Sequence, residues 1–345
     1  MPIKTSEQLH RITYDIFKAL DAPDDNADLV ARLLVKANLV GHDSHGIIRI
    51  PSYVERIKKK ALDPRAGIKV IRENGATMLV DGCWGFGQVA AWRTMEKTVE
   101  NARGNGTCIS ALFNCNHIGR LADYSLIPPK HSMIGFISCN GAARVAPFGG
   151  ADRLLNPGPL SVAIPTSDKA PVVLDISTSV VAEGKLLVRR KRHESVPEGW
   201  IIDKDGRNTT DVEGYFNDGA LLPLGGTVGY KGFGLGLMID ILGGVLTGAG
   251  SASSPNYGGG NGVIMGAIDI SRFIEPREFM MRVDELLSRI KSSRKAPGVG
   301  EILIPGEPEL REEAKRLKEG IYVEEETWSE LVDVGRSLGV DILSA

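Results

Sequence analysis

The chain has 345 residues, of which 42% are hydrophobic, a composition typical of a soluble globular protein of about two domains. Its formal net charge of -2, from 41 basic and 43 acidic side chains, argues against nucleic acid or an anionic membrane as a partner. No apolar run approaches the roughly 18 residues that span a bilayer. The N-terminus MPIKTSEQLHRITYDIF also lacks the apolar core of a signal peptide.

The cysteines are far apart in the chain and form no Cys-x-x-Cys pair. This spacing indicates free thiols in a reducing compartment rather than a disulfide framework. We therefore expect a cytoplasmic protein.

The first sixty residues predict three helices. Thr5 to Gln8 fits a capping box and is followed by an apolar stripe at helical spacing. A second helix follows Pro23 and stops at Gly41, and a third begins near Pro51. The stretch GHDSHGIIRI, residues 41–50, is then a loop between two helices.

From about residue 68 the sequence alternates between short β-type runs and helical segments. The predicted strands are 68–73, 76–80, 107–113, 133–139, 160–165, 172–176 and 262–270. The predicted helices are 92–103, 121–127, 181–190, the segment after Tyr230, 278–293, and charged helices in the last thirty-five residues. This pattern favours an α/β domain over residues 68–309, flanked by a helical domain of residues 1–67 and 310–345.

A glycine motif, Gly85-x-Gly87-x-x-Ala90, lies between a predicted strand and a predicted helix. A dinucleotide fingerprint has this local context, but it also requires an acidic residue at the end of the next strand. That strand ends in Asn114-Cys115-Asn116 and has no carboxylate there. We therefore interpret the glycines as a tight strand-to-helix turn.

Three stretches gather polar groups at the ends of predicted elements. Asp43, Ser44, His45, Arg49 and Tyr53 form the first, where a guanidinium and a phenol could face a small anion. The alternative interpretation is an Asp or Ser helix cap beside a solvated histidine. His42 and His45 are three residues apart and could together suggest a metal site. Because no cysteine or glutamate is near them in the sequence, we expect no metal site.

The second stretch is Asn116-His117-Ile118-Gly119-Arg120, directly after a predicted strand. A histidine there could move the proton that accompanies a hydride transfer, or could merely cap a helix. The third stretch places Lys231 among glycines at the start of a helix. Such a position suits a phosphate or carboxylate, and close helix packing is the alternative.

Ordered blocks along nearly the whole chain resemble one family. They include DSHGIIRIPSYV (43–54), DGCWGFGQVAA (81–91), NHIGRLADYS (116–125), VVLDISTSVVAEGK (172–185), GYKGFGLGLMIDILGGVLTGAG (229–250) and ILIPGEPE (302–309). Together they resemble the malate/L-lactate dehydrogenase family of the sulfolactate and ureidoglycolate dehydrogenase type. That family is unrelated to the Rossmann lactate and malate dehydrogenases.

The resemblance implies an α/β fold whose cofactor domain is non-Rossmann with a mixed sheet, plus a helical domain built from both chain ends. It also implies a homodimeric oxidoreductase that transfers a hydride between NAD, or NADP, and a small 2-oxo or 2-hydroxy acid. His117 or His45 would exchange the proton, and Arg49 would hold the substrate carboxylate. Our hypothesis is that His117 is the acid/base and that His45 and Ser44 position the substrate, with the phenol of Tyr53 beside Arg49; the reverse roles of the two histidines are the alternative. The implied cofactor contacts are Ser138, Asn140, Asp175, Ile176, Ser177, Lys231, Pro305, Gly306 and Glu307.

Two alternatives stay open beside the 2-oxo acid. One is a cyclic imine carboxylate as substrate, and the other is a nucleotide sensor that turns nothing over. One departure from the family is visible, because many members read TNPL where this chain has Asn156-Pro157-Gly158-Pro159-Leu160. Backbone contacts expected at that position are therefore in question.

Overall fold

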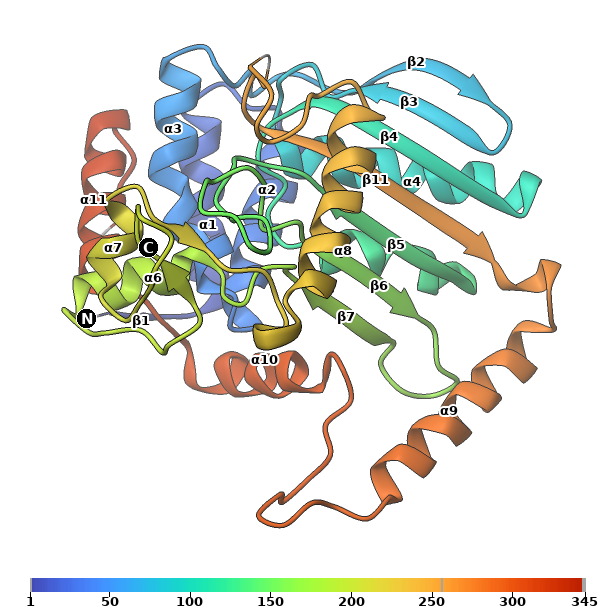
Figure 1. Ribbon diagram of the computed structural model, residues 1–345. Coiled ribbons are helices and arrows are strands. Elements are labelled where there is room, and N and C mark those ends of the chain that lie inside the picture. Colours follow the sequence, from blue (N-terminus) through green and yellow to red (C-terminus); the bar gives the residue numbers. More distant parts are fainter. Residues whose placement is uncertain (1, 256, 343–345) are drawn as a thin grey trace.

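A mixed sheet of seven strands runs through the middle of the molecule, in the order β2-β3-β4-β11-β5-β6-β7 (Figure 1). The computed structural model describes residues 2–255 and 257–342. Its strands are β2 Lys69–Asn74, β3 Thr77–Asp81, β4 Thr107–Cys115, β5 Met133–Cys139, β6 Leu160–Ile164, β7 Val172–Ile176 and β11 Asn261–Asp269. Only β3 and β4 pair in parallel, and the other neighbours are antiparallel. A Rossmann sheet is mostly parallel, so the expected non-Rossmann mixed sheet is confirmed.

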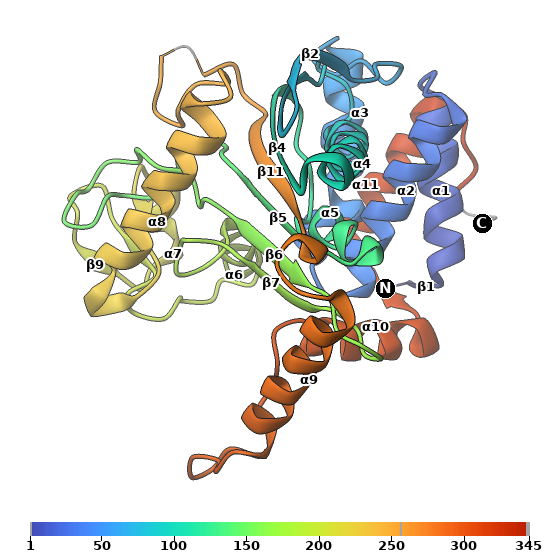
Figure 2. The same cartoon turned by 90° about the vertical axis from the view of Figure 1, so that its right-hand side faces the viewer.

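Helices cover both faces of the sheet. Their bounds are α1 Ser6–Lys18, α2 Asp24–Leu39, α3 Ile50–Lys58, α4 Gly87–Asn105, α5 Ala122–Ser125, α6 Glu183–Lys191, α7 Val212–Phe216, α8 Tyr230–Asp240, α9 Pro276–Ser292, α10 Glu307–Glu319 and α11 Glu325–Leu338. Figure 2 shows α4 and α5 on one side of the sheet and α8 on the other, with α9 projecting away. In the described part of the chain, none of the helices has both the length and the apolar character that crossing a membrane requires.

The three N-terminal helices form where the sequence predicts them. Thr5 and Gln8 make the reciprocal bonds of a capping box, with Gln8 N donating to Thr5 Oγ1 at 3.2 Å and Thr5 N to Gln8 Oε1 at 2.9 Å. The second helix begins just after Pro23, and Pro51 lies in the first turn of the third. Residues 43–49 between them form two short 3-10 turns.

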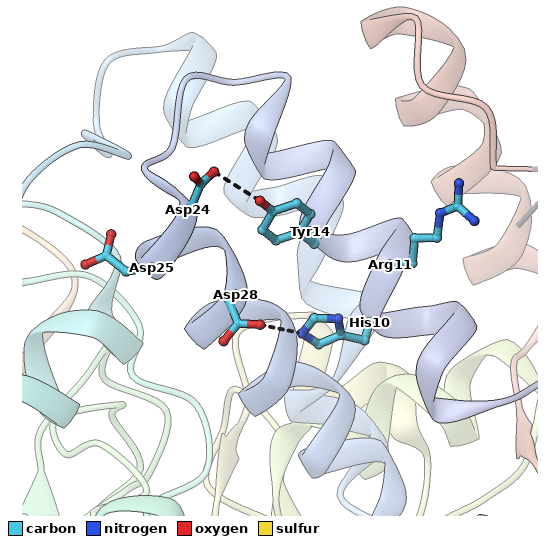
Figure 3. Close-up of a pocket in the computed structure, with 6 residues that line it drawn as sticks. All are labelled: His10, Arg11, Tyr14, Asp24, Asp25 and Asp28. Atoms are coloured by element: carbon cyan, nitrogen blue, oxygen red, sulfur yellow. Dashed lines mark hydrogen bonds and ion pairs between the residues drawn. The ribbon is translucent and has the colours of Figure 1, made fainter.

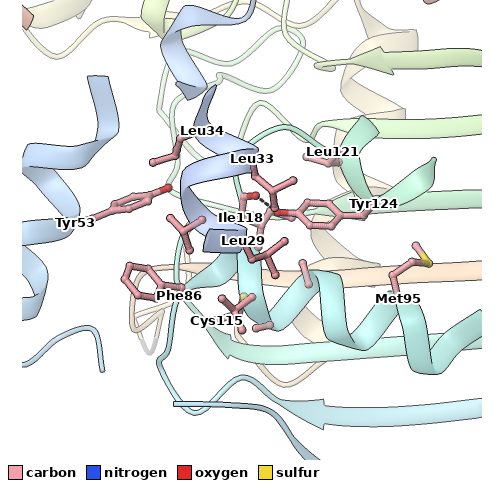
Figure 4. Close-up of a cluster of buried hydrophobic side chains, with 14 of the residues drawn as sticks. Leu29, Leu33, Leu34, Tyr53, Phe86, Met95, Cys115, Ile118, Leu121 and Tyr124 are labelled. Atoms are coloured by element: carbon pink, nitrogen blue, oxygen red, sulfur yellow. Dashed lines mark hydrogen bonds between the residues drawn. The ribbon is translucent and has the colours of Figure 1, made fainter. Parts of the chain in front are cut away.

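Segments from the two chain ends lie together in the helical layer. The short strand β1 (Ile3–Lys4) pairs with β12 (Ile321–Tyr322), and α11 lies beside α1 and α3. One cluster of buried apolar side chains runs from these helices through α4 to the sheet, as the close-up around Tyr53 and Phe86 illustrates (Figure 4). The division into domains at residues 67 and 310 stays a prediction.

The sequence pattern does not predict a small three-stranded sheet. It has the order β10-β8-β9, from strands Ala220–Leu221, Ile201–Ile202 and Asn208–Thr209. Each strand is only two residues long, so no alternation of apolar and polar residues marks it. The helix predicted over 121–127 is also shorter, because α5 ends at Ser125 and a 3-10 turn over Pro128–His131 follows.

The glycine motif serves close packing between α4 and the segment after β4. A Cβ atom added to Gly87 would lie 2.2 Å from the Asn116 carbonyl oxygen and 2.3 Å from that of His117. Only a residue without a side chain lets the first turn of α4 approach this backbone. Gly87 therefore has a structural role, which is close packing at the start of α4.

Replacing Gly87 with alanine is expected to lower the free energy of unfolding by about 1–3 kcal/mol, because the backbone at His117 must move away. Turnover should fall as well, since His117 is displaced. Urea denaturation and initial rates measure both effects. Gly104→Ala on the same helix is the control, because no atom lies within 4 Å of its added Cβ. Equal stability of the two variants would contradict this account.

Candidate active site

The loop between α2 and α3 is fastened by helices from both chain ends. Asn38 of α2 accepts a bond from Ile47 N at 2.9 Å and donates Nδ2 to Asp43 Oδ1 at 2.6 Å. Arg316 of α10 donates to the two oxygens of Asp43 at 2.6 and 3.1 Å. Neither Asp43 nor Ser44 caps a helix through its side chain, so the cap interpretation is wrong. The carboxylate of Asp43 anchors the loop instead.

His117 follows β4 directly and is held by its neighbour Asn116. The Asn116 amide donates to the carbonyl oxygens of Trp84 and Gly85, each at 2.9 Å. Its Oδ1 accepts from Arg56 Nε of α3 at 2.9 Å. Because Asn116 is buried and bonded on both sides of its amide, the backbone that carries His117 is fixed.

The structure brings all five predicted catalytic residues together. The rings of His45 and His117 stack, with centroids 5.6 Å apart and planes 26° from parallel. Tyr53 Oη lies 2.8 Å from His117 Nδ1, and Ser44 Oγ lies 3.0 Å from His45 Nδ1. Arg49 donates Nε to the Ser44 carbonyl at 2.7 Å. The helix α3 begins only at Ile50, so Arg49 joins the site from the preceding turn rather than from the helix face.

Burial keeps both histidines neutral in the free protein. Desolvation, followed by the positive charge of Arg49, lowers the pKa of His45 to about 3. The pKa of His117 is also well below its usual value, through burial first and then Arg49 and His45. Burial raises the pKa of Tyr53 to about 12, so its phenol keeps its proton. A proton can therefore be held between Tyr53 and His117 without a fixed charge.

The free energy of unfolding is expected to fall as the pH drops below about 6.5, because unfolding returns both rings to an ordinary pKa near 6.5. At lower pH both histidines are protonated in the unfolded chain but not in the folded chain. The free energy of unfolding therefore falls by about 1.4 kcal/mol per pH unit for each histidine. For His45 this continues down to about pH 3, where the folded protein also protonates it. Urea unfolding at several pH values measures the slope.

Asp175 has the opposite effect on the free energy of unfolding between pH 3.8 and about 6. Burial raises its pKa from 3.8 to about 6, so between these values the folded chain holds a proton that the unfolded chain lacks. His45→Gln should flatten the acid loss of stability, whereas Asp175→Asn should steepen it. A slope that neither variant changes would contradict the assignment.

A second polar site lies along β7, in a cavity of about 170 Å³. Asp175 and Gly306, from two of the predicted cofactor turns, both line it. Arg120 also lines the cavity. Its side chain is buried and pairs with Asp123 at 3.0 Å, but its Nε has no hydrogen-bond partner among the residues that the structure describes. Apolar walls complete the cavity, from Val40, Leu126, Pro171, Val173 and Leu310.

Two of the residues that line the cavity also interact electrostatically with His45. His42 and Arg120 line the cavity, and electrostatic interactions with these two residues also lower the pKa of His45. Asp175 accepts a bond from Ala122 N at 2.8 Å, at the start of α5 and five residues after His117. The segment from His117 to Ala122 therefore connects the two sites.

The other predicted cofactor residues do not line this cavity. Asn140 is buried and uses its amide inside the protein, donating to Gly250 O and accepting from Gly262 N, each at 2.7 Å. Ser138 is buried on β5, and Lys231 is exposed at the start of α8. Ile176 is the last residue of β7, and Ser177 follows the strand. Pro305 O accepts from Val173 N at 3.1 Å, and Glu307 pairs with Lys291 at 2.5 Å.

The departure from TNPL also has a structural role. Pro157 O accepts from Thr178 N at 2.7 Å and from Thr178 Oγ1 at 2.9 Å. Asn156 Nδ2 donates to Asp240 at 3.1 Å, at the end of α8. This tract ties the turn after Asp175 to α8.

A wider hollow of about 540 Å³ lies on the outer face of α1 and α2, away from the predicted residues (Figure 3). Its lining groups pair with one another, with Tyr14 donating to Asp24 and His10 bonded to Asp28, both at 3.0 Å. It contains none of the residues of the histidine cluster. We interpret it as a solvated surface, because its charges already have partners.

The part of the chain that the structure describes was also searched for metal ligands. Within residues 2–255 and 257–342, no group of three or more His, Cys, Asp or Glu side chains is arranged to hold a metal ion. Sequence reasoning did not single out Asn38, Gln88 or Arg316 for the site. No local pattern marks them, because their contacts join segments distant in the chain.

Comparison with known proteins identifies the family of the chain. The family model described as malate/L-lactate dehydrogenase matches residues 5–332. The malate dehydrogenase of Pyrococcus abyssi is 39% identical, over 97% of this chain and 94% of that protein. The sulfolactate dehydrogenase structure from Methanocaldococcus jannaschii is 34% identical with a TM-score of 0.90, covering 99% of both chains. The delta1-piperideine-2-carboxylate reductase structure from Pseudomonas syringae is 26% identical with a TM-score of 0.85, covering 97% of this chain and 100% of that one. The chain therefore belongs to the malate/L-lactate dehydrogenase family.

Proposed function

We propose that the chain catalyses the reversible interconversion of a small 2-oxo acid and its 2-hydroxy acid with a nicotinamide cofactor. The observation that carries this proposal is the cluster of Arg49, Tyr53 and the stacked pair His45–His117. A neutral imidazole beside a phenol suits proton exchange with a carbonyl oxygen. The family relatives named malate and L-sulfolactate dehydrogenase support the same substrate class.

In this scheme the residues of the chain bind, orient and protonate the substrate. Arg49 uses one nitrogen on the Ser44 carbonyl and offers its remaining donors to the substrate carboxylate. His117 exchanges the proton at the substrate oxygen. Its Nδ1 is held by the buried Tyr53, so Nε2 faces the opposite side of the ring. Ser44 and His45 position the substrate from the loop.

His45 is the alternative acid/base, because Ser44 orients it as Tyr53 orients His117. We favour His117 because its partner belongs to a helix and is 3% exposed, whereas Ser44 lies in a half-buried loop. A rigid partner preserves the ring orientation that proton transfer needs.

We infer that the cavity between Asp175 and Gly306 takes part of the cofactor. Its volume of about 170 Å³ is below the roughly 300 Å³ of a pocket for a whole ligand, so it fits one ring or sugar unit. The apolar walls suit a flat ring, while Arg120 Nε and the Asp175 carboxyl suit hydroxyl or amide groups. A bound nicotinamide supplies or accepts the hydride. NAD is the proposed form, with NADP as the alternative.

A cyclic imine carboxylate is the second candidate substrate. The structural relative named delta1-piperideine-2-carboxylate reductase supports it. Arg49 would hold the same carboxylate, and the proton from His117 would go to nitrogen instead of oxygen.

A panel of 2-oxo acids and cyclic imine carboxylates, each assayed by absorbance with NADH and with NADPH, tests these proposals. We expect turnover of a 2-oxo acid, and pyruvate esters serve as controls that lack the carboxylate. Turnover of imines alone would support the second candidate. Binding of NADH, followed by fluorescence, without turnover of any compound would overturn the proposal in favour of a sensor.

We also propose that the protein is a homodimer. The helix α9 is amphipathic, yet none of its 17 residues is buried. Met281 is 65% exposed and Leu286 57%. A second apolar surface covers α8 and the turn after it, where Met238 is 50% exposed and Val245 59%. Apolar surfaces of this kind usually pack against another chain.

Light scattering is expected to give the mass of two chains for the native protein. Met281→Glu combined with Leu286→Glu should shift it toward one chain, because burying two carboxylates in an apolar interface is costly. Arg289→Gln on the same helix is the control, since its side chain is exposed and pairs with Glu285. A native protein with the mass of one chain would contradict the proposal.

A cytoplasmic location remains our proposal for this protein. Four free cysteines support it, because Cys108, Cys115 and Cys139 are buried as unpaired thiols and Cys83 is exposed. Exposed thiols persist best in a reducing compartment.

A further inference from the structure

Gln88 lies behind the phenol that holds His117. It belongs to the first turn of α4 and is 1% exposed. Its Nε2 lies 2.8 Å from Tyr53 Oη, which in turn lies 2.8 Å from His117 Nδ1. Its Oε1 is buried and has no hydrogen-bond partner in the described part of the chain. Gln88, Tyr53 and His117 therefore form a chain of polar groups that begins with an unpaired acceptor.

The direction of these bonds determines where the protons lie. Gln88 Nε2 can only donate, so Tyr53 Oη accepts from it and directs its own proton toward His117. His117 Nδ1 must then be the acceptor. A neutral imidazole whose Nδ1 accepts carries its proton on Nε2.

Rotating the Gln88 amide by half a turn reverses the chain. Oε1 would then face Tyr53 and accept its proton, which frees the phenol oxygen to accept a bond from His117 Nδ1–H. His117 would carry a proton on Nδ1 and have Nε2 free, or carry both protons as an imidazolium. Asparagine and glutamine amides are suited to both roles because each has a donor and an acceptor end.

We propose that Gln88 is a positioning residue that sets, through Tyr53, which nitrogen of His117 carries the proton. The inference rests on the proposed role of His117 as acid/base. In the reduction direction, the imidazolium of His117 donates its Nε2 proton to the substrate oxygen and is left neutral with its proton on Nδ1. In the oxidation direction, the same Nε2 accepts the proton of the substrate hydroxyl and the imidazolium forms again. Both states carry a proton on Nδ1 that Tyr53 Oη must accept, so the rotated amide supports turnover in both directions, whereas the orientation seen here holds the resting Nε2–H tautomer.

Other groups around His117 do not replace this role. His45 stacks on the ring, and Arg49 faces it from the turn before α3. Around Tyr53 lie Arg49 and Arg56, whose charges favour its ionisation, and the Cys115 thiol on β4. Among the residues described, only Gln88 and His117 form hydrogen bonds with the phenol oxygen.

The test is nitrogen NMR of protein labelled in the histidine rings, recorded without substrate, because ring nitrogen shifts distinguish the tautomers. The signals of His117 are assigned by their loss in His117→Gln. We expect the Nε2–H tautomer in the native protein near neutral pH. Gln88→Glu presents only acceptors when ionised, so it should move the proton to Nδ1. Gln88→Met has a similar shape and no polar group, so it should give a mixture of tautomers.

Kinetics provide the second measurement. A carboxylate behind Tyr53 should raise the pKa seen in the pH profile of turnover by about one unit in Gln88→Glu. Gln88→Met should lower kcat about tenfold without raising that pKa. A role in packing alone would lower stability in both variants but move neither the tautomer nor the profile. That result, or an Nδ1–H tautomer in the native protein, would overturn the proposal.

The two readouts separate this inference from the proposed function. The NMR measurement needs no turnover, so it decides the tautomer even if no substrate in the panel reacts. If turnover occurs but His117 keeps one tautomer in all variants, Gln88 has no such role and the dehydrogenase proposal stands.

Discussion

Replacing His117 with alanine is expected to lower kcat by about 10²–10⁴-fold, the range that removal of a general acid/base usually costs. The substrate carboxylate would still bind Arg49, so KM should change much less than kcat. The cavity around Asp175, where we propose that part of the cofactor binds, is lined by other residues, so the affinity for NADH should be unchanged. Steady-state kinetics and NADH fluorescence titration measure these quantities separately.

His45→Ala is the matched comparison, because its ring stacks on that of His117 and is also half-buried. We expect a loss of about tenfold, since only positioning is removed. A larger loss in His45→Ala than in His117→Ala would reverse the two assignments. If both variants retained full turnover, the acid/base scheme would be wrong.

Tyr53→Phe tests whether the hydrogen bond between Tyr53 and His117 is needed for turnover. The phenol is buried and bonded to both His117 and Gln88, so its removal leaves His117 Nδ1 without its partner. A loss of kcat in Tyr53→Phe that approaches the loss in His117→Ala would show that the ring needs a fixed orientation. No loss would mean that the bond seen here has no part in turnover.

The fold could be predicted from the sequence where local signals are strong. The capping box at Thr5, the glycine stop at Gly41 and Pro51 each act on the residues next to them, and the helices begin and end there. Strands such as Met133–Cys139 have long apolar runs. The two-residue strands at Ile201 and Ala220 have no such signal, because contacts distant in the chain determine them.

The candidate site also contains both residues that the sequence identifies and residues that it does not. His45, Arg49 and His117 could be identified because reactive side chains stand out among their neighbours in the sequence. Gln88 and Asn38 could not, because a glutamine or asparagine within a helix is usually a solvated side chain. Their importance comes from tertiary contacts, which place Gln88 behind Tyr53 and Asn38 beneath the loop. The residues that orient a site are therefore harder to predict than those that react.

We expect Arg49 to link substrate binding to the protonation of the histidines. Its Nε is bonded to the Ser44 carbonyl, which fixes the guanidinium beside His45. Its positive charge is the second cause, after burial, of the lowered pKa of both His45 and His117. A substrate carboxylate on Arg49 would neutralise this charge, so substrate binding should raise the pKa of His117 and favour its acid form.

Replacing Arg49 with methionine is therefore expected to have two separate effects. The value of kcat/KM for a 2-oxo acid should fall by roughly 10³-fold, because two charge-assisted bonds to the carboxylate are lost. The pKa in the kcat/KM profile of the free enzyme should rise, because the charge that lowers the pKa of His117 is gone. Initial rates over a range of pH measure both effects.

Arg49→Lys distinguishes charge from geometry. Lysine keeps the positive charge but lacks the planar fork that binds a carboxylate through two parallel bonds. It should therefore lose much of kcat/KM while leaving the kinetic pKa near that of the native enzyme. An ester of the same 2-oxo acid has no carboxylate, so its turnover should be low in all three proteins and depend little on residue 49. If Arg49→Met reduced turnover of the ester and of the acid by the same factor, Arg49 would not be the carboxylate ligand.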